Sequence, residues 1–307
     1  RFYHKQLISK EGRQALNYLK SRQLDMRTIR KFGLGFAPDA WDATKEYLKG
    51  IGFEEKQLLE AGIIVESKGR SYDRFRNRIM FPIINQSGYV VGFGGRVMDD
   101  SVPKYLNTSE SPVFNKSNVL FGLNLARKQR PLTEIIVVEG YMDVITLYQY
   151  GYHNAVATLG TALTLEQAGL IRRYAGEAII AYDGDTAGRR AALRAIHVLA
   201  KAGCDVKVVN FPKGMDPDDI ISEYGKAYFD KLLEKSVPAT EFELELLQEE
   251  YDLETQDGKI EYVTAAAEIL SKVENVLERD VYINHLEELT GFRSELIYRQ
   301  IDVLNSK

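Results

Sequence analysis

The sequence predicts an α/β fold built from three consecutive segments, and three observations carry this prediction. Short β-branched runs alternate with helical segments between residues 134 and 236, a pattern typical of a parallel sheet covered by helices on both faces. The residues before them combine helical patterning with a pair of hairpin strands, which indicates an α+β subdomain. From residue 240 onward the apolar residues recur only at helical spacing, which predicts a helical bundle. We therefore place three subdomains at residues 1–120, 121–239 and 240–307.

In the first segment, Ile79–Ile84 and Tyr89–Phe93 are predicted to be strands joined by a hairpin-type connection. Three arginines lead into the first of these strands. If the lead-in is extended, alternate residues share one face and the three guanidinium groups project together, whereas a charged, solvated strand edge is the simpler interpretation. The three arginines are Arg74, Arg76 and Arg78.

The second segment alternates four predicted strands with three helices. The strands are Ile135–Val138, Ala155–Leu159, Ala178–Tyr182 and Val206–Phe211, and the helices run through Tyr148, across Leu165–Tyr174 and from Ala187 to Ala202. Sheets of this kind place their ligands at the carboxyl ends of the strands. We therefore expect functional residues directly after these runs.

Acidic residues stand at two of these strand ends. Glu139 directly follows the first strand, and Asp183 and Asp185 directly follow the third. Three carboxylates converging on one sheet edge would repel one another unless a cation neutralised them. Oxygen ligands of this kind suit Mg²⁺ or Mn²⁺, which also bind substrate phosphates. The sequence therefore predicts a divalent-metal site with Glu139, Asp183 and Asp185 as its catalytic centre.

Further acids can reach the same site. Asp143 lies one helical turn beyond Glu139, and Asp216 and Asp218 follow the fourth strand. An aspartate at a strand end is often only a helix N-cap, and Asp185 could cap the helix that follows it. Acids placed after successive strands of one sheet favour a metal site over a set of separate caps.

Composition and charge narrow the class of protein. Apolar residues make up 45% and charged residues 27% of the chain, and no apolar run approaches the roughly 20 residues that a membrane helix needs. The single cysteine, Cys204, excludes an internal disulfide and a cysteine-based zinc site. Residues 70–130 hold 10 basic and 4 acidic residues, whereas residues 241–307 hold 17 acidic and 6 basic ones. A basic segment in an acidic chain indicates a local polyanion-binding face, although two solvated surfaces would give the same pattern.

Other catalytic motifs do not account for these residues. The sequence has no phosphate-binding loop of the G-x-x-x-x-G-K-[ST] type and no G-x-G-x-x-G after a predicted strand. Residues 183–186 have a superficial likeness to the haloacid-dehalogenase motif D-x-D-x-T. However, Thr186 follows Asp185 directly, and Glu139 would then have no role.

The acidic motifs resemble a known signature. Glu139-Gly-Tyr-Met-Asp143 and Asp183-Gly-Asp185-Thr-Ala-Gly188 are similar to the Toprim signature shared by bacterial primases, topoisomerases and several nucleases. The basic half of the chain narrows the resemblance to the RNA polymerase core of DnaG-type bacterial primases. The motifs that carry this second likeness are Arg74-Phe-Arg-Asn-Arg-Ile-Met-Phe-Pro-Ile83, Gly92-Phe-Gly-Gly-Arg96, Pro103-Lys-Tyr-Leu-Asn107, Phe114-Asn-Lys116 and Leu120-Phe-Gly122.

The resemblance implies synthesis of short RNA primers on single-stranded DNA, by two-metal nucleotidyl transfer from NTPs. It implies metal binding by Glu139, Asp143, Asp183, Asp185, Asp216 and Asp218. It implies contacts to the incoming nucleotide by Arg96, Lys104, Tyr105, Asn107 and Lys116, and contacts to template and primer by Arg74, Arg76, Arg78, Lys104 and Lys116. Guanosine tetra- and pentaphosphate are expected to inhibit by occupying the nucleotide site.

Members of this family also carry an N-terminal zinc-binding domain and a C-terminal domain that binds the replicative helicase. Because the sequence starts at Arg1 and holds one cysteine, we expect a fragment that lacks both domains, with zinc only in the missing N-terminal one. The resemblance also implies a cytoplasmic location at the bacterial replication fork.

Two other functions stay open. Another Toprim enzyme, such as a nuclease, would degrade DNA without NTPs, while a type IA topoisomerase would need a nucleophilic tyrosine in a large gated ring, for which the chain has no room. A recombination mediator with a Toprim fold would bind DNA and metal but incorporate no nucleotide.

Overall fold

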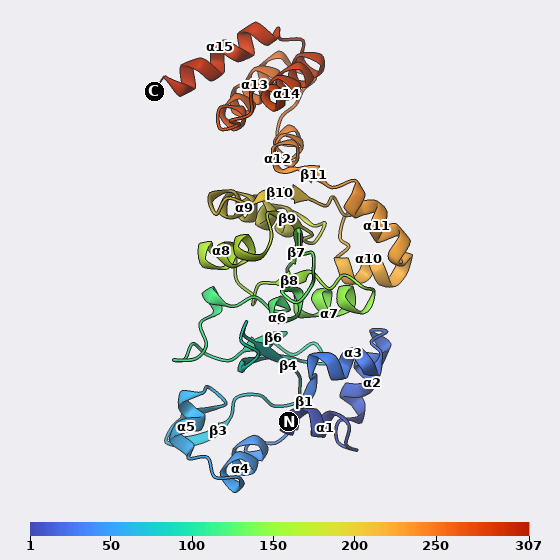
Figure 1. Ribbon diagram of the computed structural model, residues 1–307, viewed down its shortest axis with the longest axis vertical. Coiled ribbons are helices and arrows are strands. Elements are labelled where there is room, and N and C mark those ends of the chain that lie inside the picture. Colours follow the sequence, from blue (N-terminus) through green and yellow to red (C-terminus); the bar gives the residue numbers. More distant parts are fainter. Residues whose placement is uncertain (307) are drawn as a thin grey trace. The chain divides into compact units, whose positions relative to one another are not determined.

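The computed structural model describes residues 1–306 and divides the chain into two compact units. The first unit spans Arg1–Lys235, and the second begins at Ser236. Figure 1 shows the course of the chain through both units. Within the described residues, no helix is both long and apolar enough to cross a membrane.

The first unit begins with helices around a small antiparallel sheet. Strands β1 (Gly35–Ala37), β4 (Arg78–Ile84), β5 (Val90–Arg96) and β6 (Tyr105–Asn107) lie in the order β1-β4-β5-β6. A separate hairpin is formed by β2 (Ile64–Ser67) and β3 (Arg70–Asp73). The helices of this part are α1 (Phe2–Leu7), α2 (Arg13–Ser21), α3 (Met26–Phe32), α4 (Ala43–Gly50) and α5 (Glu55–Glu60). The predicted hairpin is confirmed as the β4–β5 pair.

A parallel sheet forms the centre of the first unit. Its strands are β7 (Glu134–Val138), β8 (Ala155–Ala157), β9 (Glu177–Ile180) and β10 (Asp205–Val208), which lie in the order β10-β9-β7-β8. The short helices η1 (Lys116–Asn118) and α6 (Leu123–Ala126) lead into the sheet, and α11 (Lys226–Glu234) ends the unit. All four predicted strands are present.

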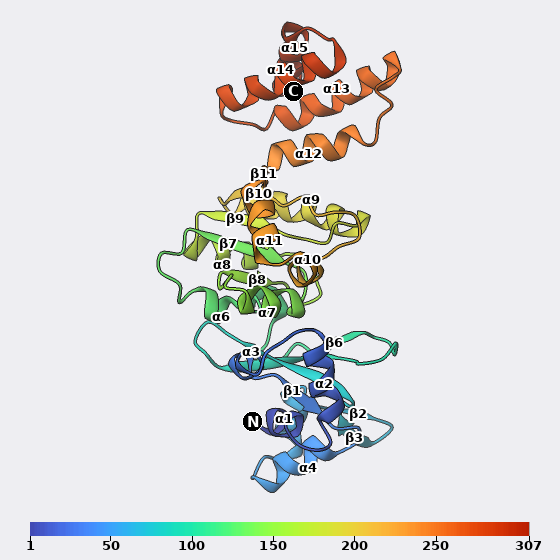
Figure 2. The same cartoon turned by 90° about the vertical axis from the view of Figure 1, so that its right-hand side faces the viewer.

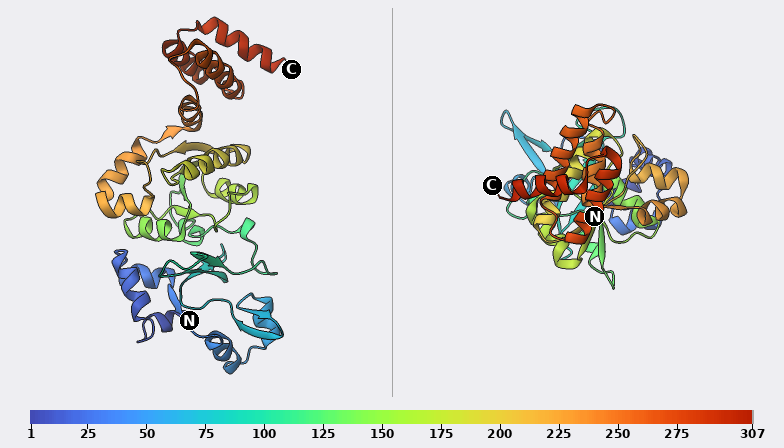
Figure 3. Two further views of the ribbon diagram at one scale, coloured as in Figure 1. Left: turned by 180° about the vertical axis from the view of Figure 1, so that it is seen from behind. Right: turned by 90° about the horizontal axis from the view of Figure 1, so that it is seen from above.

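Helices cover both faces of this sheet. Helices α8 (Leu165–Tyr174) and α9 (Thr186–Lys201) lie side by side on one face, and α7 (Tyr141–Gln149) and α10 (Pro217–Tyr224) lie together on the other (Figures 1 and 3). Burial from both sides explains the continuous apolar run of β7, where Ile135–Val138 are at most 1% exposed. Because the helices cover only the two faces of the sheet, the ends of its strands stay uncovered by them.

One hydrophobic core joins the antiparallel and the parallel sheet. Phe81 of β4 stacks on Tyr141 of α7 with ring centroids 5.1 Å apart, and Phe121 packs edge-on against the same ring. Phe32 of α3 also stacks on Phe121. The predicted subdomain boundary between residues 120 and 121 falls inside this shared core, and the division into three subdomains stays a prediction.

The second unit is a helical bundle. After the two-residue strand β11 (Val237–Pro238) it contains α12 (Ala239–Gln248), α13 (Gln256–Leu270), α14 (Val276–Thr290) and α15 (Ser294–Asn305), which Figure 2 shows from a second side. Its own apolar core includes Leu244, Tyr262, Ile283, Leu286 and Ile297. The predicted fold class, α/β with a helical bundle at its C-terminal end, is confirmed.

Candidate active site

A pocket of about 260 Å³ lies at the carboxyl ends of β7 and β9. This is the edge at which open parallel sheets bind their ligands. Acidic side chains from the central sheet and cationic side chains from the N-terminal half share its wall. The lining residues are Arg22, Arg96, Lys104, Tyr105, Glu139, Gly140, Met142, Asp143, Asp183, Asp216 and Asp218.

Glu139 and Asp183 form the centre of the acidic side. The Oε1 atom of Glu139 accepts a hydrogen bond from the backbone N–H of Asp183 at 3.3 Å. Burial raises the pKa of Asp183 to about 7, and repulsion from Glu139, Asp216 and Asp185 adds to the shift. Burial also raises the pKa of Glu139, against the lowering effect of its hydrogen bond from Asp183. The folded chain therefore holds these charges unfavourably.

Asp185 caps α9. Its Oδ1 atom accepts a hydrogen bond from the backbone N–H of Gly188 at 2.7 Å. Among the described residues it is not one of those that line the pocket, yet its negative charge raises the pKa of both Glu139 and Asp183. The cap considered as an alternative from the sequence is therefore formed, and metal binding by Asp185 stays a prediction.

Asp143 and Asp216 both combine a capping bond with a place in the pocket wall. The Oδ2 atom of Asp143 accepts from the backbone N–H of Gly140 at 2.9 Å, and the Oδ1 atom of Asp216 accepts from that of Asp219 at 2.7 Å. Burial raises the pKa of Asp143 well above its ordinary value, with repulsion from Asp216 and Asp183 adding to it. Burial raises the pKa of Asp216 as well. Each of these capping bonds engages one oxygen of the carboxylate.

Asp218 differs from the other acids because both of its oxygens have partners. It is 1% exposed. Its Oδ1 atom accepts from the hydroxyl of Thr146 at 2.7 Å, and its Oδ2 atom accepts from Nη2 of Arg22. One ligand atom each from Asp216, Asp218 and Asp219 lies within 4.8 Å of the others, a grouping compatible with a metal ion. Both oxygens of Asp218 are nevertheless engaged within the protein, and metal binding by this residue stays a prediction.

The donor set of the pocket fits a hard divalent cation. Carboxylate oxygens are the ligands that Mg²⁺ and Mn²⁺ prefer. Glu139, Asp183 and Asp216 bring their negative charges together in a partly buried place. Burial raises the pKa of each, repulsion from neighbouring acids adds to the rise, and a cation would relieve both effects. The acidic cluster therefore indicates divalent-metal binding.

Arg96 forms the centre of the cationic side. Its guanidinium lies 4.7 Å from the ring centroid of Tyr18 and 5.7 Å from that of Tyr105. Within residues 1–306, its buried Nε and Nη1 groups find no hydrogen-bond acceptor. A buried guanidinium with unpaired donors is suited to an anion with several oxygens, such as a phosphate. Lys104 adds a second charge to this wall.

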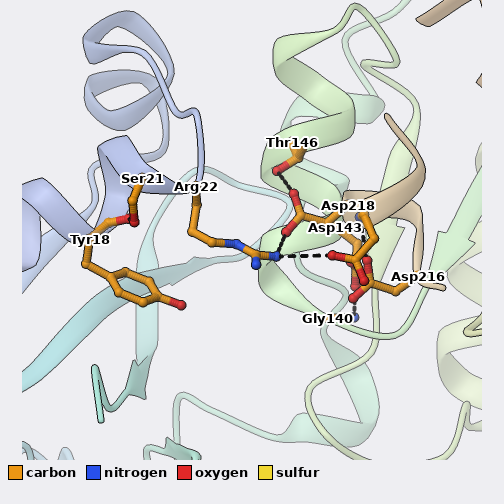
Figure 4. A network of polar contacts seen from close by, with 9 residues as sticks. Tyr18, Ser21, Arg22, Gly140, Asp143, Thr146, Asp216 and Asp218 are labelled. Carbon is orange, nitrogen blue, oxygen red and sulfur yellow. Dashed lines mark hydrogen bonds and ion pairs between the residues drawn. The ribbon is translucent and has the colours of Figure 1, made fainter. Parts of the chain in front are cut away.

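Arg22 is the pocket residue that the sequence did not reveal. It directly follows α2, and its guanidinium pairs with Asp218 (Figure 4). The same guanidinium lies 3.9 Å from Asp219. Burial lowers the pKa of Arg22, but the adjacent carboxylates, Asp218 foremost, outweigh this effect and raise it. Arg22 stands 196 residues before Asp218, so no local pattern could have linked the two.

A second contact holds the turn that carries Arg22. Gln149, the last residue of α7, donates from Nε2 to the carbonyl oxygen of Gln23 at 2.9 Å. Its Oε1 atom accepts from the backbone N–H of Asp25 at 2.8 Å. The turn between α2 and α3 is therefore attached directly to α7.

The remaining predicted nucleotide contacts lie in different surroundings. Tyr105 lines the pocket, and burial raises its pKa to about 12. The side chain of Asn107 is engaged inside the protein, because Nδ2 donates to the carbonyl of Leu159 at 2.7 Å and Oδ1 accepts from the hydroxyl of Tyr141 at 2.8 Å. Lys116 belongs to η1 and is not among the described residues that line the pocket.

The three arginines Arg74, Arg76 and Arg78, at the start of β4 and just before it, do not share one projecting face. Asn77 has a φ of 48°, which breaks the extended chain on which that expectation depended. Arg74 donates to the carbonyl of Asn107 at 2.9 and 2.8 Å. Arg78 is 8% exposed and donates to the carbonyls of Gly95 and Pro103. The expectation of a common arginine face was therefore wrong, although DNA contacts by these residues stay a prediction.

Arg76, unlike Arg74 and Arg78, lies beside aromatic rings of a kind that can stack on the bases of a nucleic acid. Its guanidinium lies 4.2 Å from the ring centroid of Trp41 and 5.1 Å from that of Tyr72. Trp41 is 65% exposed. Both rings line a surface pocket of about 930 Å³ together with Lys68 and Arg70. Exposed aromatic rings between cations are typical of surfaces on which single-stranded bases stack.

An acidic pocket at the open edge of a parallel sheet places the chain in the Toprim class of metal-binding folds, and family matches agree. A family described as Toprim-like matches residues 136–221. The DNA primase catalytic core, N-terminal domain, matches residues 2–127. The DnaB-helicase binding domain of primase matches residues 240–295.

Individual relatives and solved structures narrow the class. The DNA primase of Clostridium acetobutylicum is 44% identical over 298 residues, which are 97% of this chain and 50% of that protein. A crystal structure of a DNA primase domain from Pseudomonas aeruginosa is 42% identical with a TM-score of 0.83, covering 98% of this chain and 96% of that one. A structure of the DnaG primase catalytic domain bound to ssDNA is 37% identical with a TM-score of 0.83, covering 96% and 94%.

The chain belongs to the DnaG-type primase family. It spans about half the length of the curated relatives that it matches. The match at residues 240–295 lies in the helical unit. This match contradicts the expectation that the helicase-binding part of the family lies wholly outside this sequence, and that expectation was wrong.

Proposed function

We propose that this chain is the catalytic core of a primase, which joins NTPs into a short RNA on a single-stranded DNA template. The observation that carries the proposal is the pocket in which five carboxylates and three cations meet. The carboxylates are those of Glu139, Asp143, Asp183, Asp216 and Asp218, and the cations are Arg22, Arg96 and Lys104. A triphosphate with its divalent ions needs both kinds of partner. Membership in the primase family supports the same activity.

The acidic side would hold Mg²⁺ or Mn²⁺. Glu139, Asp183 and Asp216 would be the ligands, with Asp143 and Asp185 in support. Two such ions, when bound, would lower the pKa of an attacking hydroxyl and neutralise the leaving pyrophosphate.

The cationic side would position the nucleotide. Arg96 has its plane fixed between Tyr18 and Tyr105, and its Nε and Nη1 groups find no acceptor among residues 1–306. It can therefore bind phosphate oxygens through two N–H groups at once. Lys104 and Arg22 would add positive charge without the fixed plane of Arg96. Orientation of the α-phosphate toward the primer end is the main catalytic work left to the protein.

The template would pass over the basic surface of the antiparallel half. Arg76, Trp41 and Tyr72 offer stacking and charge together, and Lys116 and Arg74 would extend the positive surface. Asn107 and Arg78 would act there as structural supports, since their polar groups are already bonded inside the protein.

Two further partners follow from the same proposal. Guanosine tetra- and pentaphosphate would compete for the cations that bind a triphosphate. The helical unit, through residues 240–295, would contribute to contact with the replicative helicase at a fork in the bacterial cytoplasm.

One assay tests the activity. The chain is incubated with single-stranded template, labelled NTPs and Mg²⁺ or Mn²⁺, and the products are separated on a sequencing gel. We expect short labelled RNAs that require both template and metal. Degraded DNA without incorporation would indicate a nuclease, and DNA binding without either product would indicate a mediator; each result would contradict the proposal.

A further inference from the structure

Asp218 connects two parts of the first unit that are far apart in sequence. Thr146 of α7 donates to one of its oxygens at 2.7 Å, and Arg22, which follows α2, donates to the other. Figure 4 shows the three side chains in a row, with the Asp218 carboxylate between the hydroxyl and the guanidinium. The order of contacts is therefore Thr146 to Asp218 to Arg22.

The first member of this row is a buried hydroxyl in an apolar setting. Thr146 is 1% exposed, and its helix neighbours Val144, Ile145 and Leu147 are equally buried. An aliphatic side chain of the same shape would pack as well at this position. The hydroxyl therefore matters through its one hydrogen bond, which goes to Asp218.

This bond determines where the second oxygen of Asp218 points. A carboxylate turns readily about its terminal torsion. With Oδ1 fixed by Thr146, the plane of the group is set and Oδ2 is directed at Arg22. Because Asp218 is almost completely buried, loss of the Thr146 donor would leave Oδ1 without its partner and the plane without its restraint.

Arg22 depends on this restraint more than the other pocket cations do. Its side chain is 36% exposed, and a free arginine side chain has about 2 kcal/mol of rotamer entropy to lose on being ordered. Arg96, in contrast, is held between two aromatic rings. Arg22 would turn into solvent without an anchor on the pocket side.

We propose that Thr146 is a positioning residue: it orients Asp218, and Asp218 holds Arg22 in the pocket that receives the nucleotide. Asp218 then serves as the anchor of a phosphate-binding arginine and is not a ligand of the metal. The identity of the bound anion rests on the proposed function, whereas the anchoring itself rests on the contacts above.

Thr146→Val removes the hydroxyl and keeps the shape. We expect the dissociation constant for a fluorescent GTP analogue, measured with Mg²⁺ and without template, to rise about tenfold, the range for losing support from a charge-assisted bond. The KM for NTP should rise equally, with kcat within about twofold of wild type. Thr146→Ser keeps the donor and should restore binding.

A matched control separates this effect from general damage to the fold. Thr290 is also buried, and its hydroxyl donates to the carbonyl of Leu286 within its own helix in the second unit. Thr290→Val should leave nucleotide binding unchanged. Circular-dichroism melts of all variants confirm that each is folded at the assay temperature.

Two measurements can overturn the inference. Mn²⁺ affinity, followed by electron paramagnetic resonance without nucleotide, should be equal in wild type and Thr146→Val; a loss would mean that Asp218 serves the metal. In an Arg22→Gln background Thr146→Val should weaken nucleotide binding no further, and an undiminished effect there would refute the anchoring of Arg22. A wild-type chain that binds nucleotide but makes no primer would refute the proposed function alone.

Discussion

We expect the individual carboxylates of the pocket to contribute to metal binding and not to the stability of the fold. Asp183 lies between Glu139 and Asp216, and burial together with their repulsion raises its pKa to about 7. An acid whose pKa is raised in the folded state makes the fold less stable as pH rises through that range. Its removal therefore relieves repulsion instead of breaking a stabilising contact.

Asp183→Ala should abolish primer synthesis, by at least about a hundredfold, while the chain stays folded. In metal-free buffer its melting temperature should equal or exceed that of wild type, and the rise that Mn²⁺ produces in wild type should disappear. Primer assays and thermal melts with and without Mn²⁺ measure both effects. Asp205→Ala, at an exposed acid of β10, serves as the control, and full activity of Asp183→Ala in Mg²⁺ would contradict the assignment.

Arg96→Lys keeps the positive charge but loses the planar group between Tyr18 and Tyr105. Because lysine cannot form two parallel hydrogen bonds to a phosphate, the KM for NTP should rise about tenfold. Steady-state kinetics with each NTP measures this change. The exposed Arg173 of α8 allows the matched control Arg173→Lys, and an unchanged KM in Arg96→Lys would show that only charge is needed.

The loops that follow β9 and β10 bring the acidic residues of the pocket together. The backbone N–H of Gly184, after β9, donates to the carbonyl of Met215, after β10, at 3.0 Å. A Cβ atom on Gly184 would lie well inside van der Waals contact of the Pro212 carbonyl oxygen. This close approach of two backbones places Asp183 beside Asp216.

Gly184→Ala should therefore force the two loops apart. We expect a loss of about 1–3 kcal/mol in the free energy of unfolding and weaker Mn²⁺ binding, measured by urea denaturation and by titration. Gly169 in the middle of α8 has nothing within 4 Å of an added Cβ, so Gly169→Ala should stabilise the chain by about 0.5–1 kcal/mol. Equal stability of the two variants would contradict the tight contact.

The sequence predicted the elements well where the pattern is local. The helix expected across Leu165–Tyr174 has the same bounds in α8, and each strand of the parallel sheet was found within a few residues of its ends. The acids at the strand ends followed from the direction of the strands alone. Local periodicity and strand polarity are sufficient for these features.

Features that depend on distant contacts or on single backbone angles were missed. Arg22 pairs with a residue 196 positions away, so its role could not be seen in its own helix. The common arginine face failed because of one positive φ at Asn77. The hydrogen bonds that the side chain of Asn107 makes to Tyr141 and Leu159 likewise exist only in the folded chain.

Charge is divided unequally over the whole molecule. Residues 236–307 contain 17 of the 44 acidic and 6 of the 40 basic residues, so residues 1–235 carry 27 acidic and 34 basic ones. The chain as a whole has a net charge of −4, but the unit that holds the pocket is positive. The acidic unit should therefore oppose the approach of DNA through its long-range field.

A chain ending at residue 235 should bind single-stranded DNA roughly fivefold more tightly than the full chain at low salt, with the difference vanishing as salt screens the charges. Fluorescence anisotropy with a labelled oligonucleotide over a range of salt concentrations measures this. The full chain under identical conditions is the reference. Equal affinities at low salt would show that the acidic unit exerts no such field on the DNA.

Helix α7, which covers one face of the parallel sheet, also supports both walls of the pocket. Through Thr146 it orients the carboxylate that holds Arg22, and through Gln149 it fastens the backbone turn that carries the same arginine. Asp143 on the same helix lines the opposite, acidic wall. Helix α7 therefore determines how far apart the cationic and the acidic wall of the pocket lie, so that any tilt of this helix would displace residues of both walls together.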